Sequence, residues 1–94
     1  MSTNKRVRLI VRGYVQGVGF RWFTVRTAKR LALTGWVRNN SDGSVETVAE
    51  GPENSINTFI KELRIGPMSA NVKDIDILRE DFTGKFTTFS LTHA

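Results

Sequence analysis

The spacing of hydrophobic and polar residues changes along the first part of the chain, and the change occurs at a glycine-rich stretch. Before that stretch, apolar residues occupy every second position, which predicts a β-strand at about residues 6 to 13 with one apolar face. After it, apolar and small residues from Phe20 to Leu33 follow the spacing of an α-helix, with basic residues on the other side. We expect Gly35 to lie at the C-terminal end of that helix.

The middle of the chain predicts a β-hairpin followed by a second helix. Residues 36–39 form a short strand, residues 40–43 have the composition of a tight turn, and residues 44–50 alternate again. Gly51 and Pro52 then start a helix. Its apolar stripe consists of Ile56, Phe59, Ile60 and Leu63.

The last part of the chain predicts two more strands. Residues 65–67, Ile-Gly-Pro, end the second helix. A fourth strand passes through Val72, Ile75 and Ile77, and its irregular spacing predicts a bulge between Val72 and Ile75. A short fifth strand is expected from Phe86 to Leu91.

The resulting order of elements, β-α-β-β-α-β with one short extra strand, predicts an α+β fold. It is the order of the ferredoxin-like split βαβ sandwich, in which an antiparallel sheet carries both helices on one face. This fold hosts enzymes, RNA-binding modules and metal carriers, so the fold alone does not decide the function.

Length and composition narrow the possibilities. A chain of 94 residues predicts a single domain over residues 1–94. The absence of cysteine excludes disulfides, thiol nucleophiles and thiolate metal sites. The first residues lead into a strand interrupted by Arg8 and Arg12, so we expect no signal peptide, no membrane span and a cytoplasmic location.

The charge is distributed unevenly. Residues 1–41 carry nine Lys and Arg and no acidic residue, whereas residues 42–94 carry five basic and all nine acidic residues. A basic first half is compatible with nucleic acid, an anionic surface or a small anionic substrate, and charge alone does not choose between them.

The glycine-rich stretch, residues 13–21, has the properties of an anion-binding loop. Gly17 and Gly19 can adopt positive φ at little steric cost, so that successive backbone N–H groups point at one anion. The start of the following helix adds unpaired N–H groups and the positive end of its dipole. Arg21 adds a planar guanidinium that can bind two phosphate oxygens at once. The alternative is a strand-to-helix turn whose glycines serve close packing and whose arginine is solvated.

Few other residues can carry chemistry. The chain has one histidine, His93, and no cysteine, so we expect no metal, no other cofactor and no Ser-His triad. Arg21 and Asn39 remain, and neither is an acid or base near neutral pH. Such a site can bind phosphate and orient water, but it cannot protonate a poor leaving group. It therefore suits an acyl phosphate better than a phosphate ester, because a carboxylate leaves without help.

Two motifs resemble the signatures of the acylphosphatase family. Residues 11–21, VRGYVQGVGFR, resemble the first signature, and residues 35–39, GWVRN, followed by Gly43, Val45 and Gly51, resemble the second. The resemblance covers about residues 5–91. It implies the ferredoxin-like fold and metal-independent hydrolysis of the carboxyl-phosphate bond of a small acyl phosphate, with water attacking phosphorus directly.

The resemblance also implies roles for individual residues. Arg21 binds the phosphate oxygens, Asn39 orients the attacking water, and the phosphate of the substrate can itself serve as the base. Six consecutive backbone N–H groups hold the phosphate, those of Val15, Gln16, Gly17, Val18, Gly19 and Phe20. The expected enzyme is a monomer that binds neither nucleic acid nor membrane and is inhibited by inorganic phosphate or sulfate.

Two alternatives and one departure accompany this interpretation. A non-catalytic module for a phosphate ligand would use the same residues, and an RNA-binding module would share the fold and the basic first half. The strands expected to carry RNA-stacking aromatics contain none at residues 7–12 and 44–50, which disfavours RNA.

The tail departs from the family, whose members often end the last strand with arginine, whereas this chain has residues 89–94, FSLTHA. A contact between the tail and Arg21 is therefore not implied.

Overall fold

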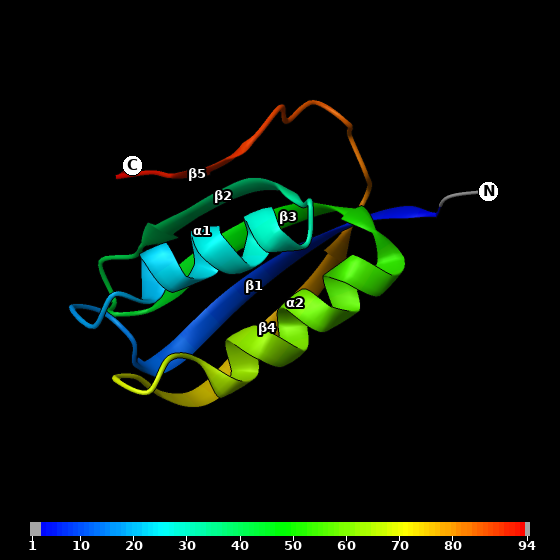
Figure 1. The fold of residues 1–94 in the computed structure, drawn as a ribbon. Helices are drawn as coiled ribbons and strands as arrows, with labels where there is room; N and C mark the ends of the chain where they lie inside the picture. The colour runs from blue at the N-terminus through cyan, green and yellow to red at the C-terminus, as the bar shows by residue number, and fades with distance from the viewer. Residues whose placement is uncertain (1–2, 94) are drawn as a thin grey trace.

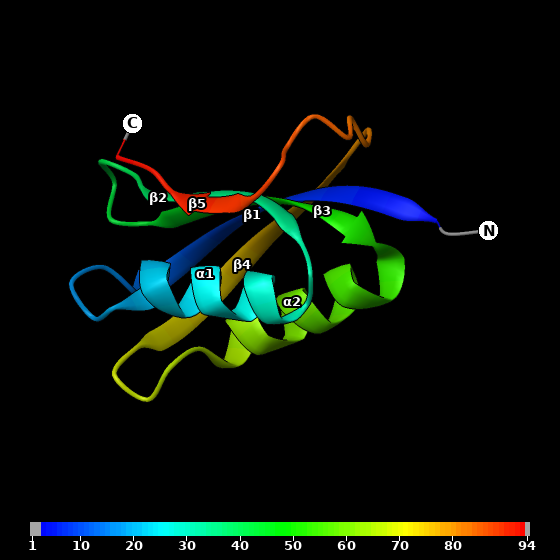
Figure 2. The same ribbon diagram turned by 45° about the horizontal axis from the view of Figure 1, so that its top comes forward.

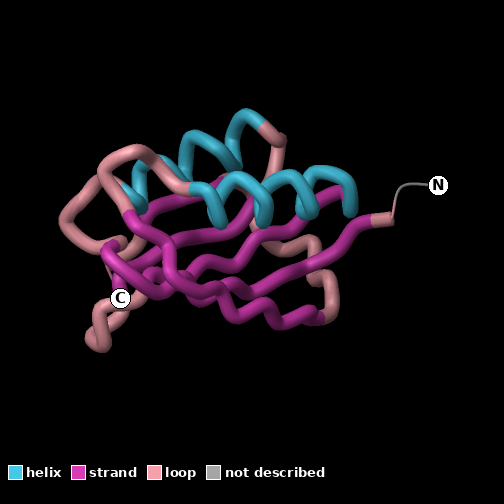
Figure 3. Tube along the Cα trace, turned by 90° about the horizontal axis from the view of Figure 1, so that it is seen from below, coloured by secondary structure: helices cyan, strands magenta, loops and turns pink. Residues whose placement is uncertain are grey.

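The computed structural model describes residues 3–93 as one sheet of five strands and two helices (Figure 1). In chain order the elements are β1 (Asn4–Tyr14), α1 (Phe20–Arg30), β2 (Thr34–Asn39), β3 (Val45–Pro52), α2 (Glu53–Ile65), β4 (Asn71–Glu80) and β5 (Phe89–Leu91). Both helices lie on the same side of the sheet, and the other side carries no helix in the described part (Figures 2 and 3).

The strand order β4-β1-β3-β2-β5 confirms the predicted ferredoxin-like fold. Pairing is antiparallel for the first four strands, and β5 adds to β2 in parallel. The loop before α1, the turn between β2 and β3 and the end of β5 consequently lie at the same end of the molecule, on the left in Figure 1.

The core lies between the helices and the sheet. The alternating residues of β1 (Val7, Leu9 and Val11) are fully buried, as the period of two predicted. All four predicted stripe residues of α2 are buried with them. The predicted bulge in β4 is confirmed as well. Arg12 of β1 pairs with Asp74 and the next residue, Gly13, pairs with Val72, so Lys73 is the extra residue of β4.

The end of α1 differs from the prediction. The helix stops at Arg30, and Ala32 takes the left-handed conformation with φ of 58°. The N–H groups of Ala32 and Leu33 bond to the carbonyls of Lys29 (3.1 Å) and Ala28 (2.9 Å), which is the Schellman pattern.

Gly35 is therefore not a cap of α1, and the prediction that it lies at the C-terminal end of this helix was wrong. It lies within β2, where an added Cβ would come within 1.9 Å of the carbonyl oxygen of Val48. The close approach of β3 requires a glycine at this position.

Two other boundaries also differ. Pro52 is the last residue of β3 and precedes α2, which begins at Glu53. The fifth strand begins at Phe89 and not at Phe86, because residues 81–88 form the loop that connects β4 at one edge of the sheet to β5 at the other.

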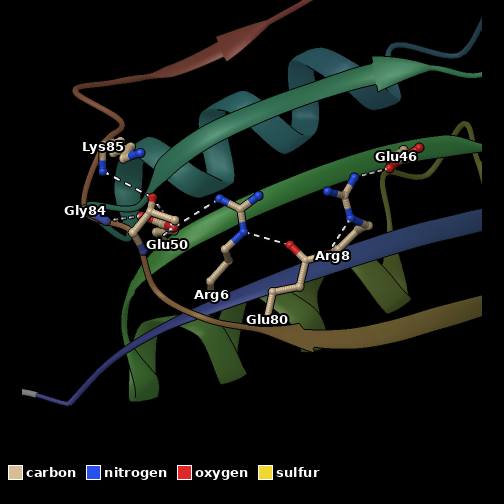
Figure 4. Close-up of polar contacts among 8 residues, drawn as sticks. Arg6, Arg8, Glu46, Glu50, Glu80, Gly84 and Lys85 are labelled. Carbon is tan, nitrogen blue, oxygen red and sulfur yellow. Dashed lines mark hydrogen bonds and ion pairs between the residues drawn. The ribbon is translucent and has the colours of Figure 1, made fainter.

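The open face of the sheet carries a network of ion pairs. Arg6 lies between Glu50 and Glu80, and Arg8 between Glu80 and Glu46 (Figure 4). Glu50 is only 1% exposed, although it is a carboxylate. It accepts hydrogen bonds from Arg6 Nη1 (3.1 Å), Thr83 N (3.0 Å), Thr83 Oγ1 (2.9 Å) and Gly84 N (3.0 Å).

Ion pairs in the fold balance much of the uneven charge of the sequence. Five of the nine basic residues among the first 41 form ion pairs, and every partner comes from residues 42–94: Arg6, Arg8, Arg12, Arg30 and Arg38. The basic first half of the sequence is thus largely neutralised by the acidic second half.

The pKa of Glu50 links this network to stability. Burial acts to raise that pKa, but the hydrogen bonds from Thr83, Arg6 and Gly84 outweigh burial and hold it below the usual 4.5. The ionised form therefore stabilises the fold above pH 4.5, and this contribution is lost as the pH falls through the lowered pKa.

We expect Glu50→Gln to lower the free energy of unfolding by about 3 kcal/mol at pH 7, because an amide turns its N–H groups toward other donors. Urea denaturation measures the change, with Asp81→Asn on the exposed loop as the control. The difference from the wild type should shrink as the pH falls below 4.5 and through the lowered pKa of Glu50. A difference that stays constant from pH 7 to pH 3 would show that the charge of Glu50 does not stabilise the fold.

Candidate active site

The loop of residues 15–19 connects β1 to α1, and its two glycines, Gly17 and Gly19, are exposed to solvent. Gly17 and Gly19 have φ of 75° and 78°, in the left-handed region, as predicted. A Cβ at either position would meet nothing within 4 Å. Backbone conformation, and not packing, therefore requires these two glycines. This result favours the anion-binding interpretation over the packing alternative.

The start of α1 leaves its positive end unneutralised. Gly19 is the N-cap and offers no side-chain hydrogen bond, and the first turn contains no acidic residue. The unpaired N–H groups and the dipole of the helix therefore remain available to an anion.

A pocket of about 80 Å³ lies at this point. Six of the eight predicted site residues line it: Val15, Gly17, Gly19, Phe20, Arg21 and Asn39. Gln16 and Val18 do not line the pocket. Trp22 also lines the pocket, although the sequence predicted no role for it, and it is 59% exposed.

Asn39 reaches the pocket from the sheet. It is the last residue of β2 and pairs with the buried Val45, two residues after the buried Val37. This alternation places Asn39 on the face that carries the helices. Its Oδ1 atom is buried without a hydrogen-bond partner, the one such side-chain atom among residues 3–93. A buried acceptor without a partner costs free energy, and it points to a ligand or water that completes it.

Arg21 is in the first turn of α1. None of the eight ion pairs among the described residues includes it. Its Nη1 atom lies 3.3 Å from Nδ1 of His93, although the sequence did not imply a contact with the tail. Its guanidinium can therefore bind an anion without first leaving a carboxylate.

Gln16 fixes the loop through its side chain, which the sequence did not reveal. Its Nε2 atom donates to the backbone carbonyls of Asn40 (2.7 Å) and Ser44 (2.9 Å) in the turn between β2 and β3. On the other side of the loop, Ser69 Oγ donates to the carbonyl of Val18 (2.8 Å). The loop is thus tied to the turn that directly follows Asn39.

Two larger hollows are less suited to an anion. One of about 420 Å³ is lined by Trp36, Arg38, Ser90 and Thr92, and Arg38 is paired with Glu46. The other, of about 280 Å³, contains Arg12, which faces the carboxylates of Asp42 and Asp76. In the small pocket, by contrast, Arg21 has no acidic partner, so charge outweighs size as a criterion.

The described residues contain no group of three or more His, Cys, Asp or Glu side chains that could hold a metal ion. None of the described helices is long and apolar enough to cross a membrane. Backbone donors, an arginine and an amide are therefore the chemical groups of this pocket.

The comparisons with known proteins agree with one another. A family model described as Acylphosphatase matches residues 7–91. An acylphosphatase of Moorella thermoacetica is 48% identical over 86 residues, which are 92% of this chain and 91% of that protein. One of Salinibacter ruber is 48% identical over 88 residues, or 94% and 93%. The crystal structure of acylphosphatase from Bacillus subtilis superimposes with a TM-score of 0.91 and 39% identity, covering 95% of this chain and 99% of that chain.

We expect Gln16→Met to weaken the binding of inorganic phosphate by about three- to tenfold, because the loop loses both side-chain hydrogen bonds to the turn. Isothermal titration calorimetry measures the change. Thr58→Ala is the control, since it removes a side-chain hydrogen bond to the carbonyl of Asn54 within α2. If both variants bind phosphate as the wild type does, Gln16 does not position the loop.

Proposed function

The chain belongs to the acylphosphatase family and is an acyl phosphate hydrolase, and from this premise we propose that the pocket between Arg21 and Asn39 is where hydrolysis occurs. The observation that carries the proposal is the buried Oδ1 atom of Asn39, which has no partner in a pocket shared with an arginine outside every described ion pair.

The phosphate of the substrate binds the loop. Backbone N–H groups of residues 15–20 and the start of α1 donate to its oxygens, and the guanidinium of Arg21 binds two of them. These donors are fixed before the substrate arrives, so they stabilise the charge of the transition state without reorganising. The side chain of Gln16 supports this role indirectly, by holding the loop against the turn.

The attacking water binds Asn39. A water that donates one hydrogen to Oδ1 is oriented with its oxygen toward phosphorus. The new P–O bond forms as the bond from phosphorus to the acyl oxygen breaks, and the electron pair leaves on the carboxylate. The proton of the water passes to a phosphate oxygen of the substrate, so no protein side chain needs to act as an acid or base.

The same geometry supports the finer expectations. We propose that no metal is required, because Arg21 and the loop supply the positive charge that a metal ion would provide. Inorganic phosphate and sulfate should compete with the substrate for this positive charge. We further propose that residues 1–94 act as one domain, as a cytoplasmic monomer.

The alternatives have less support. On the open face of the sheet, Arg6 and Arg8 of β1 are bound to carboxylates. Two of these carboxylates, Glu46 and Glu50, come from the neighbouring strand β3 and lie on the same face. Such a surface does not attract an RNA backbone. A phosphate-binding module without catalysis would bind the same anion but would not turn over acyl phosphates.

We expect the purified protein to hydrolyse benzoyl phosphate equally well with and without a chelator, with inorganic phosphate as a competitive inhibitor. A continuous absorbance assay measures both. Phosphate binding without turnover would support the non-catalytic module, and activity that is lost with chelator and restored by magnesium would contradict the proposed mechanism.

We expect Asn39→Ala to lower kcat by about 100-fold, because the attacking water loses its positioning group. Inhibition by phosphate should persist, since Arg21 and the loop remain. Stability should not fall, because the deleted Oδ1 atom has no partner in the fold.

Asn40→Ala is the matched control for this variant. Asn40 Nδ2 donates to Ser44 Oγ (3.0 Å) and Glu46 Oε1 (3.1 Å), so its loss should reduce stability by about 1 kcal/mol while kcat changes little. The opposite pattern, with normal kcat in Asn39→Ala, would remove Asn39 from the mechanism.

A further inference from the structure

The tail after β5 brings the one histidine of the chain to the proposed active site. The contact between Arg21 Nη1 and His93 Nδ1, at 3.3 Å, joins residues that are 72 positions apart in the sequence. In this chain the ring of His93 therefore lies next to the guanidinium that should bind phosphate.

The register of β5 explains how His93 reaches this position. In the parallel pair, Val37 of β2 lies beside Leu91, and the N–H of Thr92 donates to the carbonyl of Val37 at 2.8 Å. Two residues further along the same register, His93 follows Leu91 as Asn39 follows Val37. The tail thus continues along β2 toward the pocket.

The alternation of side chains gives the same result. Phe89 is buried and Leu91 packs against the core, so these two residues face the helices. Ser90 and Thr92 face the opposite side, where they line the hollow beside Trp36. His93 is two residues beyond Leu91 and so faces the start of α1, where Arg21 lies.

The chemistry of the contact links it to one protonation state of the ring. The guanidinium of Arg21 can only donate, so the two groups form a hydrogen bond when Nδ1 of His93 accepts, in a neutral ring with its proton on Nε2. A protonated ring has no acceptor, and its charge repels the guanidinium. Imidazole groups change between these two states at about pH 5 to 8.

Among residues 3–93, the surroundings offer a protonated His93 no anionic partner. α1, β2 and the loop of residues 15–19 contain no Asp or Glu. Arg38 of β2 is on the other face, bound to Glu46, and Asp42 of the neighbouring turn accepts from Ser44 and Arg12. Arg21 is therefore the charged group that the contacts of His93 show facing it.

We propose that neutral His93 is a positioning residue, which holds the guanidinium of Arg21 ready for the phosphate of the substrate and releases it when the ring is protonated. This inference rests on the proposed role of Arg21. His93 does not line the pocket and acts through Arg21. The guanidinium has five N–H donors, so Nη1 can keep its bond to His93 while the other donors bind the phosphate of the substrate. His93 should therefore affect substrate capture more than turnover.

The test compares kcat and KM for benzoyl phosphate from pH 5 to 8 in His93→Gln, His93→Ala and the wild type. We expect His93→Ala to lower kcat/KM by about three- to tenfold at pH 8 with little change in kcat, because one orienting hydrogen bond is lost. His93→Gln should restore most of this loss, since its carbonyl oxygen accepts from Arg21 at every pH. The ratio of kcat/KM between the wild type and His93→Gln should fall as the pH drops toward 5.

Ionisation of the substrate affects all variants alike, so the ratio isolates His93. Ser90→Ala, on the opposite face of β5, is the control for general effects of altering the strand, and circular dichroism verifies that each variant is folded. A ratio that is constant with pH, or a His93→Ala variant equal to the wild type at pH 8, would overturn the proposal. A ratio that rises toward pH 5 would overturn it too, because protonated His93 would then attract phosphate directly.

Arg21→Ala separates this inference from the proposed function. If Arg21→Ala is inactive while the His93 variants behave like the wild type, only the role of His93 is wrong. If Arg21→Ala keeps normal activity, the proposed function of the pocket fails as well.

Discussion

The proposed active site depends on positive charge that no described carboxylate neutralises at the start of α1. Elsewhere five arginines of the first half form ion pairs with carboxylates of the second half, and on the open face of the sheet the buried Glu50 takes part in this pairing. At the start of α1 no acidic residue occupies the first turn, the N-cap is a glycine, and the Nη1 atom of Arg21 lies 3.3 Å from Nδ1 of His93. We propose that this difference in charge favours the binding of an anion in the small pocket at the start of α1.

The rest of the fold holds three separate segments around that charge. β1 delivers the loop, β2 delivers Asn39, and the parallel strand β5 carries the tail to Arg21. Gln16 ties the loop to the turn between β2 and β3, so that the distance from the backbone donors to Asn39 is set by two hydrogen bonds to carbonyls. Preorganisation of this kind suits phosphoryl transfer, in which positioning and charge matter more than covalent chemistry.

The hydrophobic periodicity predicted the strands and helices that local sequence determines. It did not predict the features that depend on contacts between distant segments. Alternation placed β1 and the stripe of α2 correctly, because burial on one face imposes these patterns directly. The end of α1 was misplaced, since Ala32 adopts a left-handed conformation that glycine usually occupies. The two motifs identified six of the seven residues that line the pocket, all except Trp22, together with two residues that do not line it. The side-chain contacts of Gln16 and the contact of His93 depend on the packing of distant segments, so the sequence did not reveal them.

The central role of the loop and of Arg21 can be tested by titrating inorganic phosphate into ¹⁵N-labelled protein and following every backbone amide by NMR. The account predicts saturable shifts concentrated at the amides of residues 15–20 and at the Arg21 side chain, which should be absent in Arg21→Ala at the same phosphate concentrations. Shifts concentrated instead around Arg12 and Gly43, or around Arg38 and Thr92, would place the anion in one of the larger hollows and contradict it.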